Sequence, residues 1–107
     1  MISFAIATAL AAAQAGGPPI QPRRNYGACL NKFMQAKISE KMDGPTFTAA
    51  AKAACTAQET AFRQSLISYD LKMGIKRREA EENASMQVDD YLTNTTENYL
   101  SYVESDS

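Results

Sequence analysis

Large apolar side chains recur at steps of three and four residues through most of the chain after residue 25, and this spacing constrains the fold more than any other feature. Residues three and four apart lie on one face of an α-helix, so each such run predicts an amphipathic helix. We find no run of the strict apolar–polar alternation that marks a half-buried strand. The sequence therefore predicts an all-α protein.

Two breaks divide the periodic region into three predicted helices, an up-down-up unit over residues 26–104 with a frayed tail at 105–107. Asp43-Gly44-Pro45 is the first break, because Gly permits a left-handed helix end and Pro suits a first helical turn. Gly74 is the second: cations before Glu79 suit a helix C-terminus, and the acidic residues that follow suit a new N-terminus. One continuous helix through Gly74 is the alternative. The predicted buried stripes are Leu30, Phe33, Met34, Ile38 and Met42; Phe47, Ala51, Ala54, Cys55, Phe62, Leu66, Tyr69 and Met73; and Ala80, Ala84, Val88, Tyr91, Thr95, Tyr99 and Tyr102.

The first fifteen residues predict a secretory signal peptide of a bacterial protein. Residues 2–13 carry no charge, and Ala13-Gln14-Ala15 forms a small-x-small cleavage site before Gly16. A buried N-terminal helix is the main alternative; a retained membrane span is disfavoured because fifteen helical residues cover about 22 Å of a core about 30 Å thick. We expect residues 16–25, rich in Pro and Gly, to form a disordered or extended arm.

Cys29 and Cys55 are the only cysteines, and both follow the predicted signal. Export places them in an oxidising compartment, where disulfides persist. Cys29 lies fifteen residues before Gly44 and Cys55 eleven after it, so an antiparallel hairpin brings them to about the same level. We therefore predict one Cys29–Cys55 disulfide, with two buried free thiols as the alternative.

Composition narrows the possible functions without selecting one. The chain has 107 residues, 11 basic and 12 acidic side chains, a net charge of −1 and no histidine. Near-neutral charge gives no electrostatic case for nucleic-acid binding, and the commonest general base and neutral metal ligand is missing. We therefore predict no catalytic residues, no cofactor and no metal. We also expect no stable membrane anchor once the signal is cleaved.

The hypothesis that best fits these features is a periplasmic or secreted binding or structural module of the bacterial cell envelope. A protein partner or a second copy would meet it along the C-terminal helix, whose apolar residues exceed one narrow seam. The candidate partner face comprises Tyr91, Leu92, Tyr99, Leu100 and Tyr102. For the three tyrosines, the seam spacing favours packing in the core with the hydroxyls at the rim, and a partner contact is the alternative. A small periplasmic enzyme using carboxylates and a membrane-surface helical protein are the alternative functions.

Overall fold

The computed structural model describes residues 17–106, and the regular elements among them are all helical. No strand occurs in this range, which confirms the all-α prediction. The elements are α2 (Ile20–Lys37), the 3₁₀ turn η1 (Ile38–Glu40), α3 (Gly44–Ala54), α4 (Thr56–Lys72) and α5 (Arg77–Asp106).

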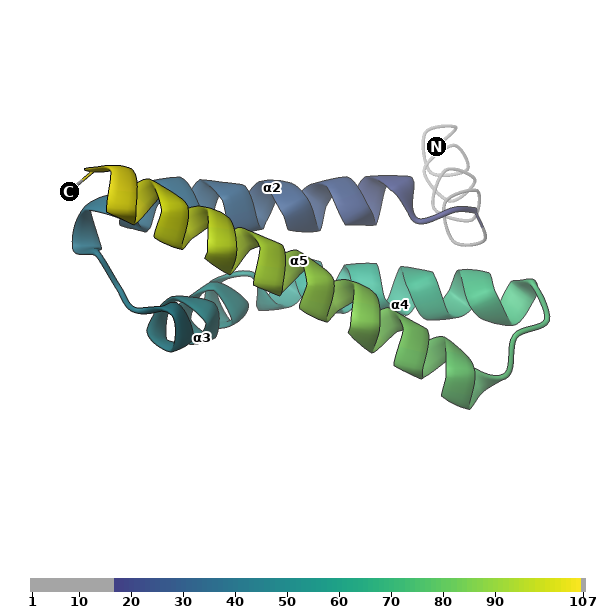
Figure 1. The fold of residues 1–107 in the computed structure, drawn as a ribbon. Helices are drawn as coiled ribbons and strands as arrows, with labels where there is room; N and C mark the ends of the chain where they lie inside the picture. The colour runs from purple at the N-terminus through teal and green to yellow at the C-terminus, as the bar shows by residue number, and fades with distance from the viewer. Residues whose placement is uncertain (1–16, 107) are drawn as a thin grey trace, which may run out of the picture.

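Helices α2 and α4 pack against one another and run in opposite directions, and α5 crosses over both (Figure 1). The second half of α5 also contacts α3 and η1, so its end lies near the end of α2. The chain thus reverses direction after α2 and again after α4. Helix α5 continues to Asp106, so residues 105 and 106 are helical where we predicted a frayed tail.

Helix α2 begins at Ile20, which corrects the prediction of a disordered or extended arm over residues 16–25. Pro22 occupies the third helical position, where a backbone N–H has no partner inside the helix and its loss is harmless. The Arg23 amide makes the first helical bond, to the Pro19 carbonyl at 3.3 Å. Of the described residues, only Gly17, Pro18 and Pro19 precede the helix.

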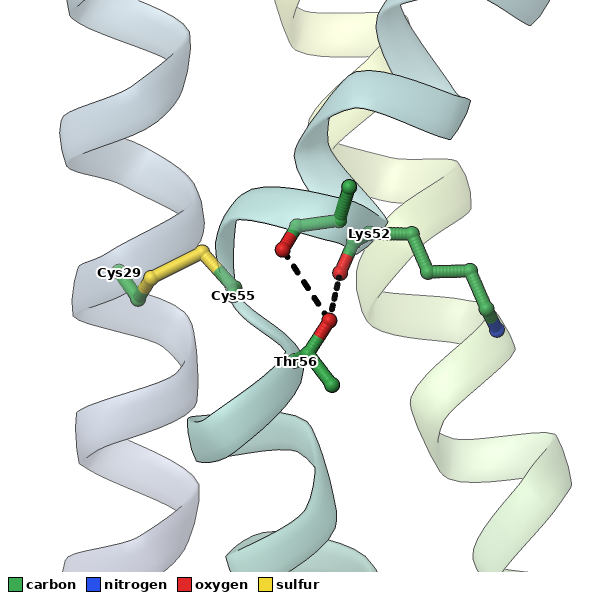
Figure 2. Close-up of a disulfide and its surroundings, with 5 residues drawn as sticks. Cys29, Lys52, Cys55 and Thr56 are labelled. Carbon is green, nitrogen blue, oxygen red and sulfur yellow. Dashed lines mark hydrogen bonds between the residues drawn. A yellow bond between two sulfur atoms is a disulfide. The ribbon is translucent and has the colours of Figure 1, made fainter.

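The second predicted helix is two helices, α3 and α4, which meet at Cys55. Cys55 has a non-helical backbone, with φ −113° and ψ 26°. The Thr56 hydroxyl lies 3.0 Å from the Lys52 carbonyl oxygen and 3.1 Å from that of Ala53, and donates to the carbonyls at the end of α3 (Figure 2). Such back-bonding by threonine bends helices, so residues 17–106 form four α-helices where the spacing predicts three.

Asp43 begins α3 as its N-cap. Its carboxylate accepts a hydrogen bond from the Thr46 amide at 2.8 Å, and Pro45 fills the first turn. The bond from the Thr46 amide, followed by that from the Thr46 side chain, lowers the pKa of Asp43 below its ordinary value. The Asp43-Gly44-Pro45 break is therefore where the sequence predicts it.

Gly74 ends α4 in the left-handed region, with φ +90°. The Gly74 amide donates to the Leu71 carbonyl at 3.1 Å, and the Ile75 amide donates to the Asp70 carbonyl at 3.0 Å. This pair of bonds is a Schellman motif, which satisfies two carbonyls at a helix C-terminus. The predicted turn at Gly74 is confirmed, and the continuous rod is wrong.

The core holds two aromatic clusters, one toward each end of α2. In the first, Tyr26 contacts Phe62 and Tyr91, with ring centroids 5.7 and 5.8 Å apart. In the second, Phe47 stacks on Tyr99 with centroids 4.0 Å apart. Ala51, Ala80 and Ala84 are also fully buried, and their small side chains let the helix backbones approach one another. The chain thus builds a core from few large side chains.

The Tyr99 hydroxyl fixes the loop that joins α2 to α3. It donates to the Lys37 carbonyl at 2.7 Å and accepts from the Met42 amide at 2.9 Å. Lys41, between these two partners, has a left-handed backbone with φ 49°. One side chain of α5 therefore holds both ends of a strained connection.

Candidate functional site

Three adjoining hollows between α2 and α5 share one residue, Tyr91, and form what we call the Tyr91 furrow. Their volumes are about 540, 150 and 270 Å³. They also share lining residues pairwise, through Arg23, Gly27 and Asn94, so they are neighbouring parts of one surface depression. The furrow is lined by Ile20, Arg23, Arg24, Gly27, Ala28, Asn31, Met34, Gln87, Asp90, Tyr91, Asn94, Thr95 and Asn98.

Gly27 opens the furrow above the Tyr91 ring. A Cβ at position 27 would stand 3.6 Å from Cε1 of Tyr91, so any side chain longer than alanine would project over the ring. Tyr26 and Phe62 hold the ring from the core side, Phe62 edge-on at 5.6 Å. Tyr91 is therefore a half-buried, firmly packed aromatic residue at the floor of an open surface.

Neutral amides line the furrow on both helices. Asn31 projects from α2, and Asn94 and Asn98 from α5. Within the part of the chain that the structure describes, these three side-chain amides form no hydrogen bond. The Gln87 oxygen, by contrast, accepts from Nη2 of Arg23 at 2.9 Å. The furrow therefore presents free donors and acceptors beside a fixed aromatic ring.

Arg23 closes one end of the furrow and is itself held in place. Its guanidinium donates to Gln87, and it also lies 5.0 Å from the centroid of the Phe62 ring, which is a cation–π distance. Asp90, one helical turn from Asn94, lines the same end. This end of the furrow thus carries charges of both signs, and the other end carries none among its lining residues.

A second depression lies over the disulfide, between α2 and the α3–α4 junction. It has a volume of about 620 Å³. Cys29 and Phe33 are half-buried in its floor, and the lining alanines leave it shallow and open. Lys32 is its single charged lining residue. This surface is mainly apolar and offers few groups that could orient a ligand.

A partly buried polar cluster around Glu59 lies next to the disulfide and lines neither depression. Glu59 contacts Arg63 at 3.3 Å and Lys52 at 3.7 Å, and Arg63 donates to the Ser85 hydroxyl at 2.7 Å. The Tyr26 hydroxyl is fully buried and has no hydrogen-bond partner among residues 17–106. Burial, reinforced by the negative charge of Glu59, raises the pKa of Tyr26 far above its ordinary value.

The predicted Cys29–Cys55 disulfide is present and joins α2 to the α3–α4 junction, with Cα atoms 6.0 Å apart (Figure 2). No free cysteine occurs among the described residues. The signal-cleavage residues Ala13, Ala15 and Gly16 lie outside the described residues.

The structure divides the predicted partner face. Tyr99 is fully buried and Leu92 is 6% exposed, so neither is available to a partner of the folded chain. Leu100 is 40% and Tyr102 50% exposed, and Tyr91 is half-buried in the furrow. The reason is that the core row of α5 advances in steps of four from Ala80 to Leu92, which carries Leu92 inward and leaves Tyr91 at the edge.

Sequence reasoning missed most of the furrow. Gly27, Asn31 and Arg23 carry no motif, and their approach to α5 depends on how α2 packs against it. Gly27 was a signal that could have been used. A glycine inside a helical pattern lowers the stability of the helix, so its presence there suggests a packing or functional requirement.

Two further features bear on function. Among residues 17–106, no group of three or more His, Cys, Asp or Glu side chains is placed to hold a metal ion. None of the described helices is long and apolar enough to cross a membrane. Comparison of the chain with protein-family models, with curated proteins and with solved structures finds no match.

Proposed function

We propose that the chain is exported from a bacterial cell, loses residues 1–15, and acts as a non-catalytic binding protein of the cell envelope. The observation that carries the proposal is the Cys29–Cys55 disulfide, which staples a small alanine-rich bundle. Disulfides of this structural kind are typical of oxidising compartments and rare in the bacterial cytosol. The uncharged N-terminal segment with its Ala13-Gln14-Ala15 site supplies the matching route of export.

The Tyr91 furrow is the binding surface in this proposal. It combines a fixed aromatic ring with free neutral amides, which is the pattern of a recognition site: an apolar platform with a few polar groups that orient the ligand. Tyr91 also belongs to the C-terminal helix, where the sequence places the partner face.

A homodimer through α5 has less support. With Leu92 and Tyr99 in the core and Tyr91 half-buried in the furrow, the exposed apolar residues left on the predicted face are Leu100 and Tyr102, too few for a stable interface. We expect size-exclusion chromatography with light scattering to give a monomer. A stable dimer that Leu100→Ser and Tyr102→Ser disrupt would favour the interaction role through the end of α5.

The test of the proposed function is processing and oxidation in a bacterium. The full chain is expressed, the periplasmic fraction is released by osmotic shock, and the protein is alkylated while denatured and unreduced. We expect a periplasmic protein that begins at Gly16 and carries no alkyl label. Soluble cytoplasmic protein that keeps Met1 and labels both cysteines would refute the proposal.

A matched pair of variants sharpens this test. Ala13→Asp with Ala15→Asp destroys both small residues of the cleavage site, whereas Gln14→Asp adds a charge at the position between them, which tolerates one. We expect the first variant to remain uncleaved and the second to be processed like the parent chain. Equal processing of both variants would show that this site is not used.

A further inference from the structure

We propose that the Tyr91 furrow binds an uncharged, hydroxyl-rich oligosaccharide chain, such as a β-1,4-linked oligomer of N-acetylglucosamine. The inference rests on the proposed function, because it names the ligand of the same surface. Its geometric basis is the meeting of Tyr91 with the free amides of Asn31, Asn94 and Asn98 in one open depression.

The furrow has the shape for a chain-like ligand. Its lining extends along α2 from Ile20 to Met34, about 21 Å, and along α5 from Gln87 to Asn98, about 16 Å, at 1.5 Å per residue. It stays at the surface along this length, because Gly27 removes the one side chain that would cross it above Tyr91. An open furrow of this kind suits an extended oligomer better than a compact molecule that needs enclosure.

The polar groups match hydroxyl and acetamido groups. A side-chain amide both donates and accepts hydrogen bonds, and so does a sugar hydroxyl. The side-chain amides of Asn31, Asn94 and Asn98 form no hydrogen bonds with other described residues, so they are available to a ligand. A carboxylate could only accept and an ammonium could only donate, so a run of three neutral amides favours a neutral ligand with both kinds of group.

Tyr91 supplies the apolar part of the site. A sugar ring presents C–H groups on its faces, and these pack on an aromatic ring with little competition from water. Tyr26 and Phe62 hold the Tyr91 ring in place, so binding costs little side-chain entropy. Thr95 adds a local constraint, since its hydroxyl donates to the Tyr91 carbonyl at 2.7 Å.

The charges at the furrow disfavour a polyanion. Arg23 and Arg24 line one end, but Asp90 lines it too, and Arg23 already donates to Gln87. A phosphate chain running on toward Asn98 would meet no further cation among the lining residues. Nucleic acids and anionic polymers need several such contacts for useful affinity.

The experiment is a nuclear magnetic resonance titration of the disulfide-bonded protein with a β-1,4-linked tetramer of N-acetylglucosamine. We expect shifts of the side-chain amide signals of Asn31, Asn94 and Asn98 and of the backbone amides near Gly27. Maltotetraose serves as a second neutral glycan, and tetra-alanine represents an extended peptide. No shift with either sugar, or shifts produced by the peptide alone, would overturn the proposal.

Two variants locate the binding. Asn94→Ala with Asn98→Ala removes two exposed amides from the furrow, and Gln35→Ala with Gln64→Ala removes two exposed amides elsewhere as the matched control. We expect the first to weaken binding about tenfold or more and the control to leave it unchanged. Gly27→Leu, which covers Tyr91 while keeping the helix, should abolish binding without lowering the melting temperature. Equal affinity in all these variants would place binding outside the furrow and refute the proposal.

The export proposal and the oligosaccharide proposal can be refuted independently of one another. An exported, oxidised protein that ignores both sugars overturns the oligosaccharide site and leaves the export proposal standing. A reduced cytoplasmic protein whose furrow nevertheless binds the tetramer overturns export and leaves the furrow's chemistry standing.

Discussion

Tyr26 and Tyr99 are both fully buried, but their hydroxyl groups have opposite surroundings. The Tyr99 hydroxyl bonds to the backbone of Lys37 and Met42, whereas the Tyr26 hydroxyl has no partner in the described part of the chain. A buried hydroxyl with no hydrogen bond lowers the free energy of unfolding by about 1–3 kcal/mol. Removing a hydroxyl that is hydrogen-bonded leaves its partners without a hydrogen bond. Tyr99→Phe should therefore lower the free energy of unfolding by about 1–2 kcal/mol, and Tyr26→Phe should leave it unchanged or raise it by about 1 kcal/mol. Urea unfolding measures both, and equal losses in the two variants would contradict this assignment.

Tyr26 also makes the fold sensitive to alkali. Burial raises the folded pKa above the value of about 10 for an unfolded tyrosine. Above pH 10 the unfolded chain loses this proton and the folded chain keeps it, so the free energy of unfolding falls as pH rises, by up to about 1.4 kcal/mol per pH unit for this group. In Tyr26→Phe this part of the slope should vanish between about pH 10 and 11, and an unchanged slope would show that other groups cause it.

At the scale of elements, two glycines in opposite environments should respond oppositely to alanine. Gly74 has φ +90° with open space around it, so Ala there suffers only the left-handed backbone and should cost about 1 kcal/mol. Gly27 lies inside α2, where a Cβ makes an ordinary 3.6 Å contact, so Ala there should stabilise by about 0.5–1 kcal/mol. Thermal melting compares them, and a raised melting temperature for Gly74→Ala would contradict the observed helix end.

The helices that the sequence predicts correctly are those whose ends carry their own chemistry. Asp43 and Pro45 cap α3, and Gly74 supplies the left-handed end of α4. The errors arise where two principles compete. Pro22 indicates an extended chain in isolation but is harmless in a first turn, and Thr56 looks like any helical residue until its hydroxyl bonds to the previous turn. The spacing of apolar residues cannot show whether the chain is extended or helical at Pro22, or whether the helix bends at Thr56, because the packing of the helices decides both.

For the molecule as a whole, the disulfide is the principal staple. It closes a loop with a sequence separation of 26, which on the loop-entropy model stabilises the fold by about 3.5 kcal/mol. The double change Cys29→Ala and Cys55→Ala should lower the free energy of unfolding by roughly this amount in urea. A loss well below 1 kcal/mol would mean that the helices hold together without it.

The packing of the helices in the whole molecule explains why the candidate site could be predicted only in part. The sequence points to the C-terminal helix and includes Tyr91 in the predicted face, because aromatic residues at helical spacing can be read directly. It cannot pair Tyr91 with Gly27 and Asn31, since these residues come together only when α2 packs beside α5. It places Tyr99 in the buried stripe of this helix but cannot supply the two hydrogen-bond partners of its hydroxyl, because they belong to the loop after α2.

The proposed export and oxidation can be tested together on the protein recovered from bacteria, by its intact mass measured without reduction. We expect the mass of residues 16–107 less two hydrogen atoms, because the proposed cleavage follows Ala15 and Cys29 is bonded to Cys55. A soluble protein that retains Met1, or a mass with both thiols intact, would contradict it.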